Sequence, residues 1–537
     1  MRMIEKKTSM ARFWLNVLFL ALIVTVLLWC GNNRAILVEK SVLAHKAWLR
    51  LGLTCVVITT GVLVLWYRSL TKARVRKRSG MIAAVSPFEK GYILACFILY
   101  FCWSASFLYW DRYGPDEVMR YSILKYIFEH RVLPTGLEKE LISPIWGFSY
   151  ALNLSIPNLI APAFMWIVSL YTQSPEALLI AARFVSVLSM TGVVWLTMQI
   201  AAKLRLGRSR WFVILLMSVT PQISFLASYV NPDSFALFVV MLIMDSWIDG
   251  LRSEWSRPAR IKLGLSMGMC FLSYSFAYSF LAGSLLLYLF WWIRNRKTVP
   301  FQRFLLIGLE MLAYTFLICG WWMIRNAVLH QGDFLSSLAT RSRMAEQYAI
   351  PEMKPSVYPT ARKQGIPIYR VPGSREWGKY TAKSVFFGLG AMDIFAAPWL
   401  YGGYQLFLAA GWALALLISM ASVRNRERRK ASVRGQVLLF GMISGAISLC
   451  LSIYYSWAID WQCQGRYVIY ALPAVGLLAA VGYEKLFDML RKRWPVSAPM
   501  LQKGAIAVFT AFSAAAQATG LLACVERFLG GNATGWP

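Results

Sequence analysis

The chain has 537 residues, of which 58% are hydrophobic, and its mean hydropathy is +0.52. Soluble domains are rarely more than about half apolar, so this composition excludes an ordinary soluble enzyme and predicts a polytopic membrane protein. In a soluble protein the formal charge of +31 would suggest nucleic acid, but no module of aromatic and basic residues accompanies it. We therefore expect no nucleic-acid partner and attribute the charge to Lys and Arg retained on the cytoplasmic side of a membrane.

Continuous apolar runs of about twenty residues predict transmembrane helices rather than the strands of a barrel. The first run follows a basic N-terminus and lacks a small-residue cleavage site, so we expect a retained signal anchor with a cytoplasmic N-terminus. Basic segments orient the later spans, and the fold class is an all-α bundle of about 13 transmembrane helices. The expected spans are 13–30, 50–67, 91–110, 177–201, 211–229, 233–249, a hairpin of two short helices over 263–293, 303–323, 399–421, 435–455, 467–484 and 504–524.

Two long segments, 111–154 and 326–398, are expected on the outer face, and the second is basic over much of its length. The stretch 156–171 is apolar but contains two prolines, which favours an interfacial or re-entrant helix over a full span. The predicted domains are 1–90, with two N-terminal spans and a basic cytoplasmic loop; 91–484, the transmembrane core with both outer loops; and 485–537, with a C-terminal span.

The first group of ionisable residues follows the third expected span. Pro115 suits the first turn of a helix expected over 116–130. Asp116 and Glu117 then lie at the helix N-terminus, where the helix dipole favours anions, and Arg120 lies on the same face as Asp116. The pattern fits a capped surface helix with solvated charges. It also fits a carboxylate pair at the outer leaflet, in which one acid deprotonates an acceptor hydroxyl.

Three further groups of polar residues are expected on the same face. The sequence Trp-Trp-Met-Ile-Arg-Asn fits an aromatic belt with a snorkelling arginine, and Asn-Pro-Asp-Ser fits a helix cap. Arginine at the outer leaflet opposes the usual charge bias and favours a phosphate partner. The candidate residues are Asn231 and Asp233, then Trp322, Arg325 and Asn326, and finally Gln464, Arg466 and Tyr467.

Three motifs occur in a fixed order along the chain: Tyr-Gly-Pro-Asp-Glu with Arg120, Trp-Trp-Met-Ile-Arg-Asn with Gly332-Asp333, and Gln-Gly-Arg-Tyr with Leu472-Pro473. With these motifs in this order, the chain resembles a family of predicted bacterial membrane proteins of unknown function that is related to the GT-C glycosyltransferase superfamily. That superfamily includes protein O-mannosyltransferases and the lipid A aminoarabinose transferase. The resemblance covers about residues 91–484.

The resemblance implies a GT-C-like helical bundle and an inverting transferase on the outer face of the bacterial cytoplasmic membrane. Its partners would be a polyprenyl-phosphate-linked sugar as donor, a cell-envelope glycan or lipid as acceptor, and membrane lipids. The first outer-loop acid of such enzymes carries over to Asp116 as the catalytic carboxylate, with Glu117 as its neighbour. Arg120, Arg325 and Arg466 are the expected donor-phosphate ligands. The expected substrate-binding residues are Asn231, Asp233, Trp322, Asn326, Gln464 and Tyr467.

Cofactor use stays open at this point. Where related chains have His shortly after the acidic pair, this chain has Arg120, so a metal role does not carry over to that position. A divalent cation stays one of the cofactors that the sequence allows. The three histidines lie far apart, so no histidine metal site is expected.

Two other functions fit the sequence. A transporter or flippase for polyprenyl-linked glycans needs ionisable residues near the bilayer midplane, for which Asp245 and Glu310 are the main candidates. A scaffold of an envelope complex would need no chemistry, and its outer arginines would be expendable.

Overall fold

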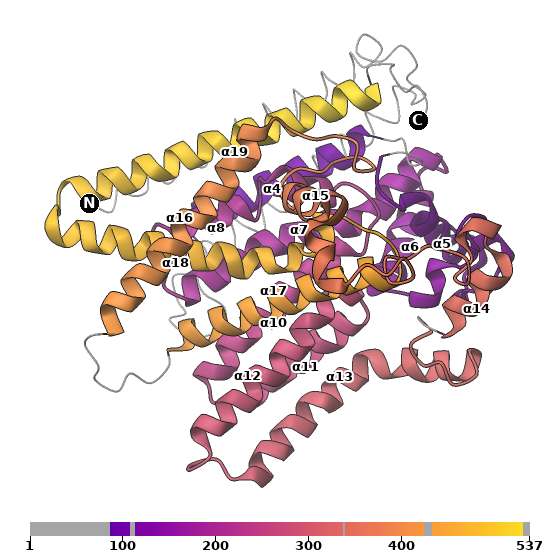
Figure 1. Cartoon of the computed structure of the whole chain (residues 1–537), viewed down its shortest axis with the longest axis horizontal. Coiled ribbons are helices and arrows are strands. Elements are labelled where there is room, and N and C mark those ends of the chain that lie inside the picture. Colours follow the sequence, from indigo (N-terminus) through magenta and orange to yellow (C-terminus); the bar gives the residue numbers. More distant parts are fainter. Residues whose placement is uncertain (1–85, 108–112, 337–338, 424–431, 530–537) are drawn as a thin grey trace. The chain divides into compact units, whose positions relative to one another are not determined.

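The apolar runs form long helices in the computed structural model, which describes residues 86–107, 113–336, 339–423 and 432–529 (Figure 1). Residues 83–524 group into one unit, and a second unit comprises 1–82 and 525–537. The expected spans at 13–30 and 50–67 lie outside the described residues. Within the described ranges there is no β-strand, only an isolated bridge between Leu389 and Ile394.

Eight helices in the described part of the chain are long and apolar enough to cross a membrane. The expected all-α polytopic membrane fold is therefore confirmed, and the number of spans in the whole chain stays a prediction. The eight are α7 (Pro175–Lys203), α10 (Asp233–Arg252), α12 (Ser279–Asn295) with the preceding turn η4 (Ser275–Tyr278), α13 (Phe301–Leu329), α16 (Pro398–Val423), α17 (Val433–Ala458), α18 (Leu472–Arg493) with the preceding turn η8 (Ile469–Ala471), and α19 (Ser497–Leu529).

The other described helices are mostly shorter. Helix α4, with 20 residues, forms where the span at 91–110 is expected and packs against α7. The two helices expected at 263–293 are present as α11 and α12, but they do not pair as a hairpin: α11 packs against α10 and α13, and α12 packs against α17. The stretch at 156–171 forms α6, whose 14 residues make it shorter than a span. These helices are α4 (Pro87–Ser106), α5 (Glu117–His130), α6 (Ile156–Ser169), α8 (Arg210–Leu216), α9 (Pro221–Leu226), α11 (Arg257–Phe271), α14 (Ala339–Tyr348) and α15 (Trp377–Ser384), with single turns η2 (Lys139–Leu141), η3 (Tyr150–Asn153), η5 (Pro351–Met353), η6 (Ile368–Glu376) and η7 (Gly465–Tyr467).

The continuous span expected at 211–229 is wrong. The chain forms two short helices there, α8 and α9, because Pro221 opens a new helix after an extended Thr220. The break leaves backbone groups without helical partners, and side chains of α4 meet this need. Tyr100 donates its hydroxyl to the carbonyl of Ser218 at 2.6 Å. Irregular backbone is tolerated at membrane depth only where protein surrounds it, and this stretch is almost entirely buried.

Small residues let the long helices approach closely. Helix α16 packs along α18 in the part of the bundle where Figure 1 shows the two crossing. A Cβ atom at Gly482 would come within 1.9 Å of the carbonyl oxygen of Gly411, so a larger residue would push the two helices apart. Such contacts between small residues drive helix association where lipid removes the hydrophobic advantage of burial.

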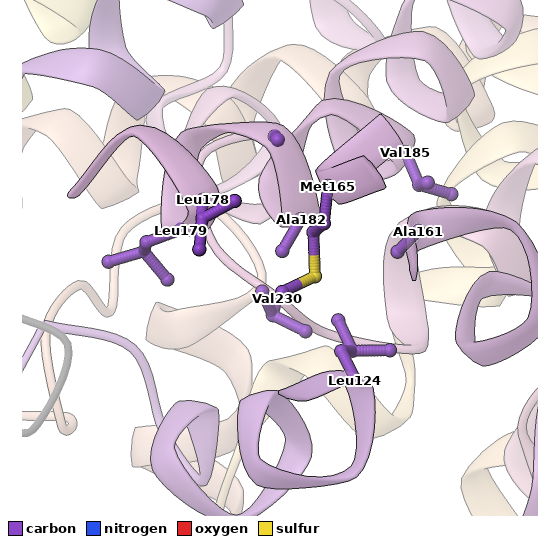
Figure 2. Close-up of a cluster of buried hydrophobic side chains, with 9 residues drawn as sticks. Leu124, Ala161, Met165, Leu178, Leu179, Ala182, Val185 and Val230 are labelled. Atoms are coloured by element: carbon purple, nitrogen blue, oxygen red, sulfur yellow. The ribbon is translucent and has the colours of Figure 1, made fainter. Parts of the chain in front are cut away.

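Helix α5 is fixed by apolar packing on two sides. Figure 2 shows Leu124 of α5 meeting Met165 of α6, residues of α7 and Val230. The preceding residue of α5, Ile123, packs instead in a second cluster that includes Trp322 of α13. Burial of apolar side chains on both sides holds the N-terminal end of α5 in a defined position, which matters because that end carries the acidic pair.

Candidate active site

Asp116 lies at the start of α5 in a backbone conformation that few residues adopt. Its φ is 61°, in the left-handed region, which costs a non-glycine residue about 1–2 kcal/mol and which Asp tolerates better than most. The turn before it is tight because a Cβ atom at Gly114 would lie 2.2 Å from the ring of Tyr229. The Asp116 side chain is 29% exposed, so its carboxylate is held firmly and remains accessible.

Arg466 contacts this carboxylate from a distant part of the chain. Its Nη2 donates to Oδ2 of Asp116 at 3.1 Å and to the hydroxyl of Tyr467 at 3.1 Å. Burial would raise the pKa of Asp116, but the positive charges of Arg466 and Arg120 outweigh it and hold that pKa below its usual 3.8. Asp116 is therefore ionised at neutral pH.

The turn that carries Arg466 requires a glycine. The backbone N–H of Gly465 donates to Oγ of Ser384 at 2.7 Å, and a Cβ atom there would lie 2.1 Å from the backbone nitrogen of Val385. Only glycine allows η7 to approach α15 this closely. This contact places the Arg466 guanidinium beside Asp116. Arg466 is buried there, with 5% of its surface exposed.

Several buried polar atoms around Asp116 have no hydrogen-bond partner among the described residues. Arg466 keeps Nε and Nη1 unpaired, although its Nη2 is used. Electrostatic interactions also couple Asp233 to Arg466, Arg120 and Asp116. Buried polar groups are normally satisfied, so several unpaired ones around one carboxylate indicate a ligand site. The further unpaired atoms are Nε of Arg120, the hydroxyl of Tyr229, Oδ2 of Asp233 and Oε1 of Gln464.

Aromatic side chains line this site. The Arg120 guanidinium lies over the ring of Tyr150 at 4.4 Å and over that of Tyr274 at 5.8 Å. Burial and the charge of Asp116 raise the pKa of Tyr150 to about 12, so its phenol stays protonated. The ring of Tyr467 stacks on Phe276 at 4.5 Å, which places it in the wall of the site. The tyrosines other than Tyr467 carry no spacing signal in the sequence, because each comes from a different loop.

Glu117 points away from Asp116 and is fully buried. Arg183 of α7 grips it with two hydrogen bonds, Nε to Oε1 at 2.8 Å and Nη2 to Oε2 at 2.6 Å. The backbone N–H of Val230 adds a third hydrogen bond to Oε1 at 2.7 Å. Sequence analysis missed Arg183, although a lone charge inside an apolar span is a signal of a buried partner. Both oxygens of Glu117 are thus occupied by protein donors.

The two polar residues of the turn before α10, Asn231 and Asp233, have different roles. Oδ1 of Asn231 accepts from the backbone N–H of Ser234 at 2.9 Å, which confirms the helix-cap interpretation for this residue. Its amide nitrogen donates to the carbonyls of Leu226 and Tyr229, so no polar atom of Asn231 faces the site unpaired. Asp233 differs, because its Oδ1 accepts from Tyr470 at 2.8 Å while Oδ2 stays unpaired beside the site.

The Trp322–Asn326 segment lies away from Asp116. Nη2 of Arg325 donates to the carbonyls of residues 133 and 134, which follow the C-terminal end of α5. A helix of 14 residues is about 21 Å long, so this contact lies at the opposite end of α5 from Asp116. Trp322 is 4% exposed and packs in the core, and the amide of Asn326 donates to Oγ of Ser336 at 2.9 Å. The structure does not bring this segment together with the Asp116 and Arg466 pair.

The third sequence motif does reach the site. Gln464 uses its amide nitrogen to donate to Oε1 of Gln462 at 2.7 Å, and its Oε1 is unpaired. Of the residues expected around the donor, Arg120, Asp233, Arg466 and Tyr467 therefore lie around Asp116, and Gln464 directly precedes the turn η7 that carries Arg466.

The described residues offer no ready metal site. No three His, Cys, Asp or Glu side chains in these ranges gather closely enough to hold a metal ion. Asp116 and Asp233 are two carboxylates, but Arg466 and Tyr470 already occupy one oxygen of each. The chemistry proposed below uses the side chains themselves.

The charged residues expected for a transporter are already neutralised. Asp245 pairs with Lys203 at 2.8 Å and with Lys262. Glu310 pairs with Arg260 and lies 3.8 Å from Arg257. These pairs connect α7 and α11 to α10, and α11 to α13.

No family model matches the chain, and a search of curated proteins finds no match. Among solved structures, ArnT from Cupriavidus metallidurans bound to undecaprenyl phosphate is similar, with 14% identity and a TM-score of 0.47 over 82% of this chain and 78% of that one. Its apo state gives 12% identity and a TM-score of 0.46 over 81% and 77%.

The oligosaccharyltransferase from Archaeoglobus fulgidus, in complex with Zn and sulfate, gives 14% identity and a TM-score of 0.49 over 80% of this chain. The chain spans about half, 53%, of the length of that protein. Both neighbours are GT-C glycosyltransferases. These likenesses concern the path of the backbone alone.

Proposed function

We propose that this chain is a membrane glycosyltransferase that takes a sugar from a polyprenyl-phosphate-linked donor and transfers it to a cell-envelope glycan or lipid. The observation that carries the proposal is the contact between Asp116 and Arg466, made at one end of the helical bundle beside unpaired arginine nitrogens. A base next to anion-binding donors is the combination that such a transfer needs. We place the protein in the bacterial cytoplasmic membrane, with this site on the outer face and the N-terminus inside.

The donor phosphate would bind to the two arginines that face Asp116. The unpaired Nε and Nη1 of Arg466 point to opposite sides of the guanidinium, and each can donate a hydrogen bond to a phosphate oxygen. Arg120 adds a second positive charge, held in place by the rings of Tyr150 and Tyr274. Charge neutralisation by these groups stabilises the polyprenyl phosphate as it leaves.

Asp116 would act as the general base. It accepts the proton of the acceptor hydroxyl while the hydroxyl oxygen forms a bond to the anomeric carbon of the sugar. The bond between that carbon and the phosphate oxygen breaks, and the electron pair leaves with the polyprenyl phosphate. Attack from the face opposite the leaving group inverts the anomeric centre, so we propose an inverting transferase.

Donor binding would also strengthen the base. In the free protein, Arg466 and Arg120 hold the pKa of Asp116 low, which makes it a weak base. A bound phosphate anion shares these positive charges and adds negative charge nearby, and both changes raise the pKa of a carboxylate. Asp116 would therefore gain basicity only when a donor is present.

Glu117 would position Asp116 rather than react. Its buried pairing with Arg183 ties the first turn of α5 to α7, and the hydrogen bond from Val230 ties it to the loop before α10. These contacts fix the strained backbone of the neighbouring Asp116.

The test combines ligand binding with sugar transfer. The full chain in detergent should bind undecaprenyl phosphate in native mass spectrometry, and Arg466→Gln should weaken that binding. Membranes that contain the wild type should transfer labelled sugar from a polyprenyl-phosphate donor to envelope material, and Asp116→Asn should reduce transfer by at least about 100-fold, as expected for loss of a general base. Glu129→Gln, on the exposed face of the same helix, is the matched control. Undiminished transfer by Asp116→Asn would remove Asp116 from the mechanism.

A further inference from the structure

A cavity of about 920 Å³ lies at the other end of the helical bundle. Helix α10 has Asp233, beside the proposed active site, as its first residue and Arg252, which lines this cavity, as its last. The 20 residues of α10 span about 30 Å, so the cavity and the site lie at opposite ends of the bundle. The cavity is therefore separate from the transfer chemistry. Its basic surroundings mark it as the cytoplasmic end by the usual charge bias.

One part of the cavity wall is apolar and open to the surroundings of the bundle. Helices α16, α17 and α18 contribute Leu416, Leu439, Met442 and Leu478 to this wall. Leu416 is 60% exposed and Leu439 is 50% exposed, although both belong to helices that could cross a membrane. This part of the wall would contact hydrocarbon chains.

The rest of the lining is strongly basic, with Arg205, Arg252, Arg434 and Lys485. Nη2 of Arg434 donates to the backbone carbonyl of Arg205 at 3.3 Å, and Arg252 donates to the carbonyl of Lys203. These carbonyls fix the guanidinium groups and leave their formal charges unbalanced.

The acidic residues near this lining already pair with other cations. Asp245 and Asp249 accept from Lys203 at 2.8 Å. On α18, Glu484 and Asp488 accept from Arg491 at 2.9 and 2.6 Å. The net charge facing the cavity therefore stays positive, and an occupant that brings negative charge is favoured.

Among the described residues, no acidic side chain forms an ion pair with Arg252 or Arg434. The connection between α16 and α17, residues 424–431, has five Lys or Arg and one Glu in its sequence. An occupant from outside the chain must then be anionic at one end and apolar at the other.

We propose that this cavity binds an acidic phospholipid of the cytoplasmic leaflet. The phosphate would contact Arg252 and Arg434, and an acyl chain would lie along Leu416 and Leu439. The cytoplasmic leaflet is rich in anionic lipids, and each nearby Lys or Arg adds to their attraction. The site would tie α10, α16, α17 and α18 together through a bound lipid, independently of whether the opposite end transfers sugar.

The test is a lipid titration of the full-length protein in detergent, followed by native mass spectrometry. Wild type should bind phosphatidylglycerol in preference to phosphatidylethanolamine, and inorganic phosphate at the same concentration should not displace it. The double variant Arg252→Gln/Arg434→Gln should weaken phosphatidylglycerol binding by about 30-fold. The matched control is Arg296→Gln/Lys297→Gln, which removes two exposed charges from the turn between α12 and α13 at the same basic end.

A second variant tests the apolar part of the site. Leu439→Trp keeps every charge and adds bulk at an exposed position, so it should reduce phosphatidylglycerol binding without lowering the thermal unfolding midpoint. Equal binding of the two phospholipids would overturn the proposal, as would an equal loss in the control double variant. Displacement by inorganic phosphate would overturn it too, because the site would then recognise the anion without the lipid.

Discussion

The buried ion pair between Glu117 and Arg183 gives the sharpest test of whether Asp116 and Glu117 have different roles. Both side chains are fully buried, and the two hydrogen bonds between them are 2.6 and 2.8 Å long. Glu117→Gln removes the negative charge, so the Arg183 guanidinium keeps neutral acceptors such as the carbonyls of Ser104 and Phe107 but loses its counter-charge. Breaking one partner of a buried pair costs about 3–5 kcal/mol, because the other charge stays buried without compensation.

The assay is thermal unfolding of the purified protein in detergent micelles. Glu117→Gln should lower the unfolding midpoint clearly, whereas Glu129→Gln should change stability by about 0.5 kcal/mol or less, because Glu129 is half-exposed and 3.7 Å from Lys125. The double variant Glu117→Gln/Arg183→Met should lose less than the two single variants added together, because it leaves no unpaired charge.

Two results would refute this reasoning. If Glu117→Gln and Glu129→Gln shift the unfolding midpoint equally, the pair does not anchor α5. If Glu117→Gln abolishes sugar transfer with no change in the midpoint, Glu117 reacts in the way proposed for Asp116.

Three other predictions follow from the site geometry. Gly465→Ala should lower both stability and transfer, because the new Cβ would lie 2.1 Å from backbone, whereas Gly504→Ala, with open space around it, should leave both unchanged; thermal unfolding and the transfer assay compare them. Arg325→Gln should change the affinity for undecaprenyl phosphate far less than Arg466→Gln, since Arg325 contacts carbonyls at the far end of α5; equal losses in native mass spectrometry would contradict this. Because the neighbouring arginines lower the pKa of Asp116 in the free protein, its ion pair is intact above the usual 3.8 and is lost as pH falls below that value. The acid limb of kcat/KM, which reports the free protein, should therefore lie below about pH 4 for wild type and should move to higher pH in Arg466→Gln; an unmoved limb would argue against the coupling.

The sequence by itself determined the class of protein and much of the helix pattern. Hydropathy is a local property, so a run of apolar residues reveals a span such as α13 or α17 without knowledge of its neighbours. The same holds for the Gly-Pro break that starts α5 and puts Asp116 at its N-terminus. It also holds for Asn231, whose type and place before a helix predict the cap that is seen.

The tertiary structure alone decided which residues meet. Asp116 and Arg466 are 350 positions apart, and no periodicity links them. Arg325 looked equivalent to Arg466, yet the packing of α13 on α5 carries it to the other end of that helix. The helix break near Ser218 escaped hydropathy because its residues are as apolar as those of a continuous span, and a residue distant in sequence, Tyr100 of α4, satisfies the carbonyl of Ser218. Contacts of this kind depend on how helices pack across the bundle, and the residues that specify the packing are spread over the whole chain.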